Sequence, residues 1–195
     1  MYLEECTLKI KQNELFEEEA ITAICEVFHA NADDITDFIV LKKGMTNRSF
    51  TFRCNGKRYI IRISGAGTDK LIDRYQEKKV YETIGDMNIC DPVIYINPEK
   101  GYKITEFLEN SRVCDPMNCL DVKRSMECLK KFHDKKLVVG HEFDLFEQIE
   151  KYEVLWGNSE SIYEDYEKTK SEVYSLKAFI DGHITEKVLT HIDAV

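Results

Sequence analysis

The chain has 195 residues, of which 43% are hydrophobic and 32% are charged, and its formal net charge is −9. A chain of this length can form one hydrophobic core or two small lobes. The negative charge argues against a nucleic-acid partner, which would need a basic surface, and no apolar run has the form of a membrane span or signal peptide. We therefore expect a cytoplasmic protein with no nucleic-acid and no membrane partner.

The cysteines support the same compartment. There are seven of them, an odd number, and none forms a C-x-x-C pair. This usage is typical of reduced thiols rather than of a disulfide framework or a zinc site. We predict no metal site from them.

The first third of the chain carries one helical pattern followed by three strand-like patterns. Apolar residues recur at helical spacing after an acidic start, which predicts a leading helix over about residues 17–29. Asn55-Gly56 is a strong hairpin signal, because both turn positions require positive φ. The three predicted strands cover residues 36–42, 49–54 and 57–63.

The next stretch adds one helix and two strands to this pattern. The helix is predicted over residues 69–84, with Gly85 as its C-terminal cap. The strands are predicted over residues 93–96 and 101–107, on either side of a turn that contains Pro98. A small antiparallel sheet with one inserted helix follows from this order.

After about residue 110 the strand signals stop. Three apolar stripes at helical spacing follow, and the last of them ends at Gly182. The sequence thus predicts two parts, a lobe over residues 1–109 and a helical part over residues 110–195. The three stripes lie within residues 122–133, 145–156 and 162–180.

Arg62 and Glu77 are two opposite charges that both point inward in the predicted elements. Alternation along the third strand places Arg62 on the same face as Ile60, and apolar residues follow Glu77 at i+3, i+4 and i+7. A buried guanidinium needs an anionic partner, so the two side chains are expected to meet. The alternatives are a purely structural salt bridge, or pairing of Glu77 with Arg74 one turn back.

Two short motifs at opposite ends of the chain complete the candidate site. The turn at Gly44 lets the backbone approach a ligand, and Asn47 and Ser49 supply short polar groups for phosphate oxygens, although many hairpin loops look the same. The chain ends in an apolar stretch that runs into His191-Ile192-Asp193.

The order of these features is more specific than any one of them. The features follow the kinase-type order. This order is a strand, a glycine turn, a hairpin, an inward cation, a helix with an inward glutamate, two strands, helices and then His-x-Asp. The chain resembles the choline/ethanolamine kinase family, especially the bacterial LicA-like choline kinases, in the aminoglycoside phosphotransferase and protein-kinase-like superfamily. The matching stretches are Lys43-Gly44-Met45-Thr46-Asn47-Arg48-Ser49-Phe50, Tyr59-Ile60-Ile61-Arg62-Ile63, Asp73-Arg74-Tyr75-Gln76-Glu77, Gly101-Tyr102-Lys103-Ile104-Thr105-Glu106-Phe107 and Leu189-Thr190-His191-Ile192-Asp193-Ala194-Val195.

The resemblance implies an α+β, protein-kinase-like fold, with an N-terminal antiparallel five-stranded sheet, one inserted helix and an incomplete helical C-terminal lobe. It also implies a role for each matched residue of the first lobe. Arg62 would bind the ATP phosphates where a lysine is usual and would pair with Glu77, which suits the planar fork of a guanidinium. The remaining nucleotide-binding residues would be Gly44, Asn47, Arg48 and Ser49 over the phosphates, and the link of Glu106, Phe107 and Leu108 beside the adenine.

For the second part, the resemblance implies a catalytic loop. Asp193 would orient the substrate hydroxyl and accept its proton late, since a carboxylate with a pKa near 4 is too weak to deprotonate an alcohol beforehand. His191 would hold the loop in shape. The expected reaction is ATP-dependent phosphoryl transfer to choline, or to ethanolamine, giving phosphocholine.

The resemblance implies ATP and Mg²⁺ as cofactors, and here the sequence departs from the family pattern. The family's magnesium-binding asparagine follows the aspartate by five residues and a further aspartate comes soon after, so both would lie beyond Val195. We expect a chain that is truncated within the catalytic loop and inactive alone. Another small-molecule kinase of the aminoglycoside type and a non-catalytic nucleotide-binding fragment stay open as alternatives.

Three expectations concern the helical part. Trp156 lies on a stripe with Leu145 and Ile149, so core packing is favoured over an aromatic box for an ammonium group. His133 is expected to be a buried, hydrogen-bonded histidine rather than a ligand. An unfinished helical lobe would expose apolar surface, which favours a homo-oligomer.

Overall fold

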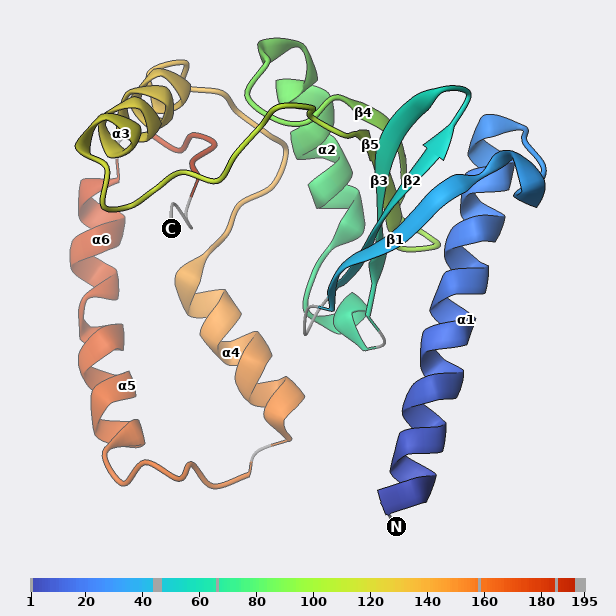
Figure 1. Cartoon of the computed structure of the whole chain (residues 1–195). Coiled ribbons are helices and arrows are strands. Elements are labelled where there is room, and N and C mark those ends of the chain that lie inside the picture. The colour runs from blue at the N-terminus through green and yellow to red at the C-terminus, as the bar shows by residue number, and fades with distance from the viewer. Residues whose placement is uncertain (1, 44–46, 66, 158, 185, 192–195) are drawn as a thin grey trace. The chain divides into compact units, whose positions relative to one another are not determined.

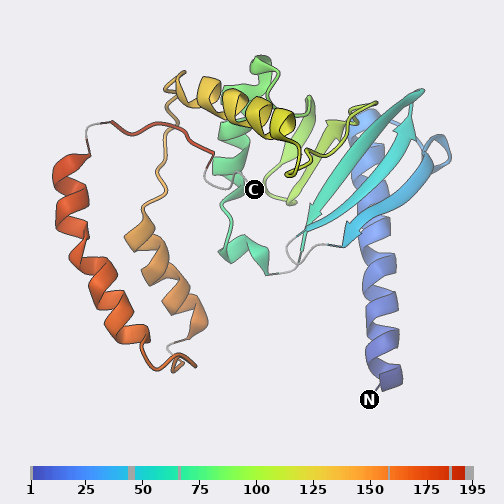
Figure 2. The ribbon, with the colours of Figure 1, turned by 60° about the vertical axis from the view of Figure 1, so that its left-hand side comes forward.

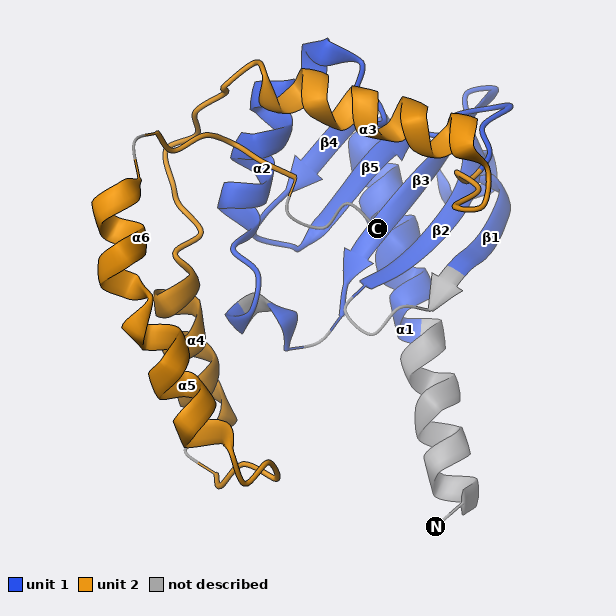
Figure 3. Cartoon of the chain, turned by 90° about the vertical axis from the view of Figure 1, so that its left-hand side faces the viewer, with its two compact units in different colours: residues 1–112 blue, residues 113–195 orange. Residues whose placement is uncertain are grey.

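The computed structural model describes residues 2–43, 47–65, 67–157, 159–184 and 186–191. The chain divides into two compact units, residues 1–112 and 113–195, which Figure 3 shows in different colours. The first unit holds a five-stranded antiparallel sheet with the strand order β1-β2-β3-β5-β4. The α+β class and the sheet with one inserted helix are confirmed.

The strands lie within two residues of their predicted ranges. Asn55 and Gly56 have φ of 51° and 76°, so the two-residue hairpin between β2 and β3 has the positive φ at both positions that its sequence predicts. The edge strand β1 pairs with β2 through an irregular register. The five strands are β1 Thr36–Lys43, β2 Asn47–Cys54, β3 Lys57–Ser64, β4 Val93–Asn97 and β5 Tyr102–Glu106.

The hydrophobic core of the first unit lies on one face of this sheet, against α1 (Tyr2–Phe28). Side chains alternate along β3, so Ile61 and Ile63 are buried in the core while Arg62 points to the other face. The helix contributes small and branched residues such as Ala20 and Ile24. Figure 1 shows the sheet between α1 and α2, so the two helices cover opposite faces.

The leading helix is longer than predicted. It begins at Tyr2 rather than near residue 17 and ends at Phe28. Residues 2–16 contain neither proline nor glycine and are rich in Leu, Glu and Lys, which are good helix formers. The acidic run at residues 17–19 therefore lies inside the helix and does not mark its start, which corrects the prediction.

The inserted helix α2 (Arg74–Ile84) is shorter than predicted at its start. A separate 3₁₀ turn occupies Thr68–Lys70, and Asp73 caps α2 by accepting hydrogen bonds from two backbone N–H groups of its first turn. Gly85 is right-handed and opens another 3₁₀ turn, so it is not the predicted left-handed cap. Asn88, with φ of 53°, takes the left-handed conformation instead.

Gly101, at the turn between β4 and β5, lies close to Ser64 of the neighbouring strand β3. Its φ is 66°, and a Cβ there would lie 3.0 Å from Ser64 Oγ. We predict that Gly101→Ala lowers the free energy of unfolding by about 2–3 kcal/mol, because left-handed strain and crowding add. Gly56→Ala is the matched control, since φ is also positive there but nothing lies within 4 Å. Urea unfolding measures both, and equal losses would exclude the crowding effect.

The second unit is helical. Phe146 of α4 packs edge-on against Tyr174 of α5, and Lys170 donates to both oxygens of Glu153 at 2.7 Å. Figure 2 shows α6 continuing nearly in line with α5. In the described part of the chain, no helix combines the length and apolarity needed to cross a bilayer. The four helices are α3 Cys119–His133, α4 Leu145–Trp156, α5 Tyr166–Ser175 and α6 Lys177–His183.

Three sequence expectations for this unit are wrong in detail. Gly182 lies inside α6, which ends at His183, and Ile162 lies outside the helices and is almost fully exposed. Trp156 is 43% exposed and contacts Tyr166 edge-on at 5.7 Å between ring centroids, so it is not a core residue. Helical spacing identifies which residues share a face but not how deeply that face is covered.

Candidate functional site

Four charged residues meet on the sheet face that α1 does not cover, and we call them the Glu77 cluster. Oε1 of Glu77 accepts from Nη2 of Arg62 at 2.6 Å and lies 3.6 Å from Nζ of Lys103. Its second oxygen, Oε2, accepts from Nη1 of Arg74 at 3.1 Å. One carboxylate is therefore shared by three cations.

Secondary structure brings these four residues together from three elements. Arg62 and Lys103 are direct cross-strand partners on β3 and β5, so their side chains leave the sheet on the same face. Glu77 lies in the first turn of α2, which the cap at Asp73 holds in place. Two like charges on facing strand positions repel each other, and the carboxylate of Glu77 offsets that repulsion.

The expected pairing of Glu77 with Arg62 and the alternative pairing with Arg74 both occur. The carboxylate binds Arg62 across the elements and also binds Arg74, three residues back on its own helix. Arg74 is only 8% exposed, and its Nη2 donates to Oγ1 of Thr68 at 3.1 Å. Thr68 in turn donates to the carbonyl of Gly65 at 2.8 Å, so the arginine is tied to the loop that follows β3.

The pKa values of the cluster follow from burial and charge. Burial alone would raise the pKa of Glu77, but the three cations outweigh it and lower the pKa of this carboxyl group. Burial, with a smaller contribution from Arg62, lowers the pKa of Lys103 to about 8. Lys103 also donates to the hydroxyl of Tyr81 and lies over its ring, 3.8 Å from the centroid.

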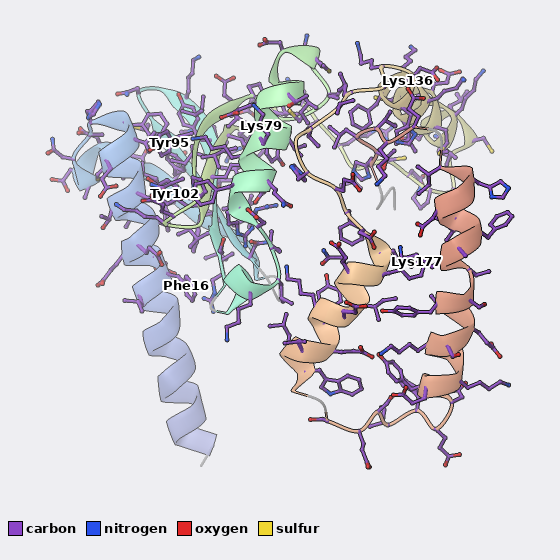
Figure 4. All side chains as sticks on the ribbon, turned by 180° about the vertical axis from the view of Figure 1, so that it is seen from behind. Phe16, Lys79, Tyr95, Tyr102, Lys136 and Lys177 are labelled. Atoms are coloured by element: carbon purple, nitrogen blue, oxygen red, sulfur yellow. The ribbon has the colours of Figure 1, made fainter. Side chains whose placement is uncertain are left out.

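The residues after the glycine turn fall on two different faces. Ser49 is the cross-strand partner of Arg62, and Asn47 pairs with Ser64 at the end of the same ladder. Arg48 lies between them in β2 and points to the α1 face, where its guanidinium is 4.3 Å from the ring centroid of Phe16, labelled in Figure 4. The structure therefore does not bring Arg48 to the cluster, because neighbours in a strand face opposite ways. Gly44 lies outside the described residues.

The predicted adenine-binding link lies along the β3–β5 ladder, at the end away from Arg62 and Lys103. Glu106 pairs with Tyr59, three residues along β5 from Lys103, which corresponds to about 10 Å. The backbone N–H of Glu106 donates to Pro92 and that of Phe107 to Arg58, so protein carbonyls occupy these two donors. Leu108 is 45% exposed.

In the second unit, His191 lies next to the end of α3. Its backbone N–H donates to Nε2 of His133 at 3.2 Å, and Leu189 N–H donates to the carbonyl of Leu137. His133 is hydrogen-bonded, as expected, but it is half-buried rather than buried. Asp193 lies outside the described residues.

No group of three or more potential metal-ligating side chains occurs among the residues that the structure describes. The cluster is instead rich in cations, which suits an anionic ligand.

Lys103 is the member of the cluster that sequence analysis missed. Its alternation with Tyr102 and Ile104, both buried in the core, shows that it faces away from the core. Nothing local, however, fixes the register that sets it beside Arg62. The burial of Arg74 was not evident either, because the first residue of a helix is usually exposed.

The sheet, the inserted helix and the helical second unit together define a kinase-like fold, and comparisons with known proteins agree. No family model matches the chain. Two curated proteins named LicA, both from Haemophilus influenzae, are similar to it. One is 26% identical over 148 residues, covering 71% of this chain and 42% of that protein. The other is 25% identical over 129 residues, covering 62% and 46%. The chain thus spans less than half the length of these relatives.

Solved structures give the same result. The choline kinase LicA from Streptococcus pneumoniae is 27% identical with a TM-score of 0.73, over 91% of this chain and 61% of that one. A structure of LicA in complex with AMP is 26% identical with a TM-score of 0.69, over 90% and 61%. A choline/ethanolamine kinase family protein from Mesorhizobium loti, 20% identical with a TM-score of 0.64 over 86% and 55%, shows the fold alone. The resemblance to LicA-like choline kinases is confirmed.

Proposed function

We propose that the Glu77 cluster binds the phosphates of ATP and that the whole protein transfers the γ-phosphoryl group to the hydroxyl of choline. The observation that carries this proposal is the pairing of Arg62 with Glu77 at 2.6 Å in a cluster with two further cations. A guanidinium can grip phosphate oxygens with two parallel hydrogen bonds. The similarity to a choline kinase and to a LicA that binds AMP supports the ligand and the acceptor.

In this proposal the nucleotide lies along the β3–β5 ladder. Glu106 and Leu108 flank the adenine at one end, and Arg62 meets the phosphates at the other. Ser49 is the partner of Arg62 on the neighbouring strand and contributes its hydroxyl to the phosphates. The backbone near Gly44 and the amide of Asn47 cover the phosphates. The side chain of Arg48 takes no part.

Asp193 and His191 are the proposed catalytic-loop residues. The Asp193 carboxylate would orient the choline hydroxyl for in-line attack and take up its proton as the new P–O bond forms. His191 would hold the loop, and its backbone bond to His133 supports that role. We expect Mg²⁺ to enter with ATP and to be held by residues outside the described ones.

The acceptor is tested with the whole protein. Transfer of radiolabelled phosphate from ATP is measured with choline, ethanolamine and kanamycin at equal concentrations. We expect transfer to choline first, then to ethanolamine, and none to kanamycin. Transfer to kanamycin alone would favour an aminoglycoside-type kinase, and nucleotide binding without transfer to any acceptor would favour a non-catalytic role. The chain is expected to bind ADP through the Glu77 cluster.

Two further expectations belong to this proposal. An ATP-dependent activity and free thiols such as Cys54 and Cys90 fit the cytoplasm. Exposed apolar side chains in the second unit, among them Ile162 and Phe179, favour self-association. Light scattering of the purified chain would test the latter, and a monodisperse monomer would contradict it.

A further inference from the structure

The Glu77 cluster holds more positive charge than an ion pair needs. Among the described residues, Glu77 is the one carboxylate within 4.0 Å of the three cations. Arg62 is 35% exposed, but the side chains of Arg74 and Lys103 are only 8% and 11% exposed. Burial of charge without a counter-ion is unfavourable. The surplus of positive charge therefore points to an anion that binds at the cluster.

Arg74 is placed to fix the orientation of Glu77. It binds the carboxylate oxygen that Arg62 does not use, and its other terminal nitrogen is held by Thr68. With both oxygens occupied, the carboxylate cannot rotate away from Arg62 without breaking a second charge-assisted hydrogen bond. The Arg62–Glu77 pair is therefore preformed rather than assembled by a ligand.

Lys103 is placed to balance the charge of Glu77 from the sheet side. Its Nζ lies 3.6 Å from the same oxygen that Arg62 binds, and Tyr81 holds the ammonium group through its hydroxyl and its ring. A ligand reaches this buried group less readily than it reaches Arg62. Its effect on a bound anion is therefore chiefly through its charge.

We propose that Arg74 and Lys103 are positioning residues of the phosphate site, which fix and neutralise Glu77 so that the charge of Arg62 stays available to the nucleotide. The inference rests on the proposed role of Arg62. An isolated Arg62–Glu77 pair would attract a phosphate several ångströms away only weakly, because its positive and negative charges nearly cancel at that distance. The two additional cations make the site net positive, as an ADP or ATP polyphosphate requires.

The proposal predicts a pH dependence of binding, because Lys103 is the cluster member that titrates near neutrality. Its pKa of about 8 in the free protein rises when a phosphate binds nearby, so binding takes up a proton and affinity falls as pH increases from 7 to 9. The groups that face Lys103 are Arg62 on β3, Glu77 and Tyr81 on α2, and Cys90 and Asp91 before β4. Burial raises the pKa of both Tyr81 and the Cys90 thiol, which moves their titration upward and away from neutral pH.

The experiment measures the affinity of the chain for ADP by calorimetry, in EDTA, at pH 7, 8 and 9. The wild type is expected to lose about fivefold in affinity across this range. Lys103→Met is expected to bind about three- to tenfold more weakly at pH 7 and to show little change with pH. Lys103→Arg keeps its charge at every pH and is expected to bind as tightly as the wild type at pH 7, with a flat profile. Arg74→Met should weaken ADP binding at every pH and keep the wild-type dependence of affinity on pH. Arg74→Lys should recover part of the lost affinity.

The controls separate this inference from the proposed function. Lys79→Met removes an exposed cation of α2 that pairs with Glu82, and it is expected to change nothing; Figure 4 labels Lys79 on its helix. Thermal unfolding checks that each variant folds. Lys103→Met removes a buried charge but does not leave Glu77 unpaired, because Arg62 and Arg74 still bind its carboxylate. If Lys103→Met and Lys103→Arg keep the affinity and pH slope of the wild type, the inference is wrong. If Arg62→Met binds ADP normally, the proposed function fails instead.

Discussion

Replacement of Arg62 by methionine is expected to weaken ADP binding by about 10- to 100-fold, since a hydrogen bond to a charged group contributes about 1.5–3 kcal/mol. Arg62 is the most exposed cation of the Glu77 cluster and therefore the one that a phosphate can reach. Glu77 keeps Arg74 and Lys103 as partners after the substitution, so the carboxylate is not left unpaired. Calorimetric titration of the chain with ADP measures the effect.

The matched control is Arg53→Met, on the neighbouring strand β2. Arg53 pairs with Asp37 at 3.0 Å, its side chain is 41% exposed, and it lies four residues along β2 from Ser49, the cross-strand partner of Arg62. ADP affinity is expected to stay within about twofold of wild type there, since exposed ion pairs contribute little. Arg62→Lys should retain part of the binding, because a lysine supplies the charge but not the two parallel hydrogen bonds of a guanidinium. An unchanged affinity in Arg62→Met would remove the basis for a nucleotide site at this cluster.

Replacement of Asp193 by asparagine is expected to reduce the turnover of the whole protein by about 10²–10⁴-fold. The amide keeps the size of the side chain but cannot accept the proton of the acceptor hydroxyl. Binding of ATP should remain within about threefold of wild type, since the proposed role of Asp193 concerns the acceptor and the transition state. Steady-state phosphate transfer to choline, with ATP and choline varied separately, measures both quantities.

Asp181→Asn is the corresponding control in the second unit. Asp181 forms an exposed i,i+4 ion pair with Lys177 in α6, so loss of this pair should leave turnover within about twofold of the wild-type value. A turnover of Asp193→Asn equal to that of this control would show that Asp193 is not the catalytic carboxylate. A parallel loss of ATP affinity would instead indicate that the loop has lost its shape.

Local chemistry is sufficient for much of the fold. The hairpin at Asn55-Gly56 follows from two residues that tolerate positive φ, and the strand ranges follow from period-two alternation. The same alternation predicts that Arg62 lies on the same strand face as Ile60, and the apolar spacing after Glu77 predicts that its carboxylate points toward the packed side of its helix. Helix starts are less well determined, because good helix formers continue α1 back to Tyr2 and a separate turn delays α2 to Arg74.

Periodicity along the chain predicts a small antiparallel sheet with an inward arginine and a helix with an inward glutamate. The folded structure is needed to show that Glu77 is shared by three cations, that Lys103 lies beside Arg62, and that Arg48 points toward α1. The reason is physical. Periodicity reports the face on which a side chain lies, whereas the register between strands and the seating of a helix depend on contacts between residues far apart in the chain.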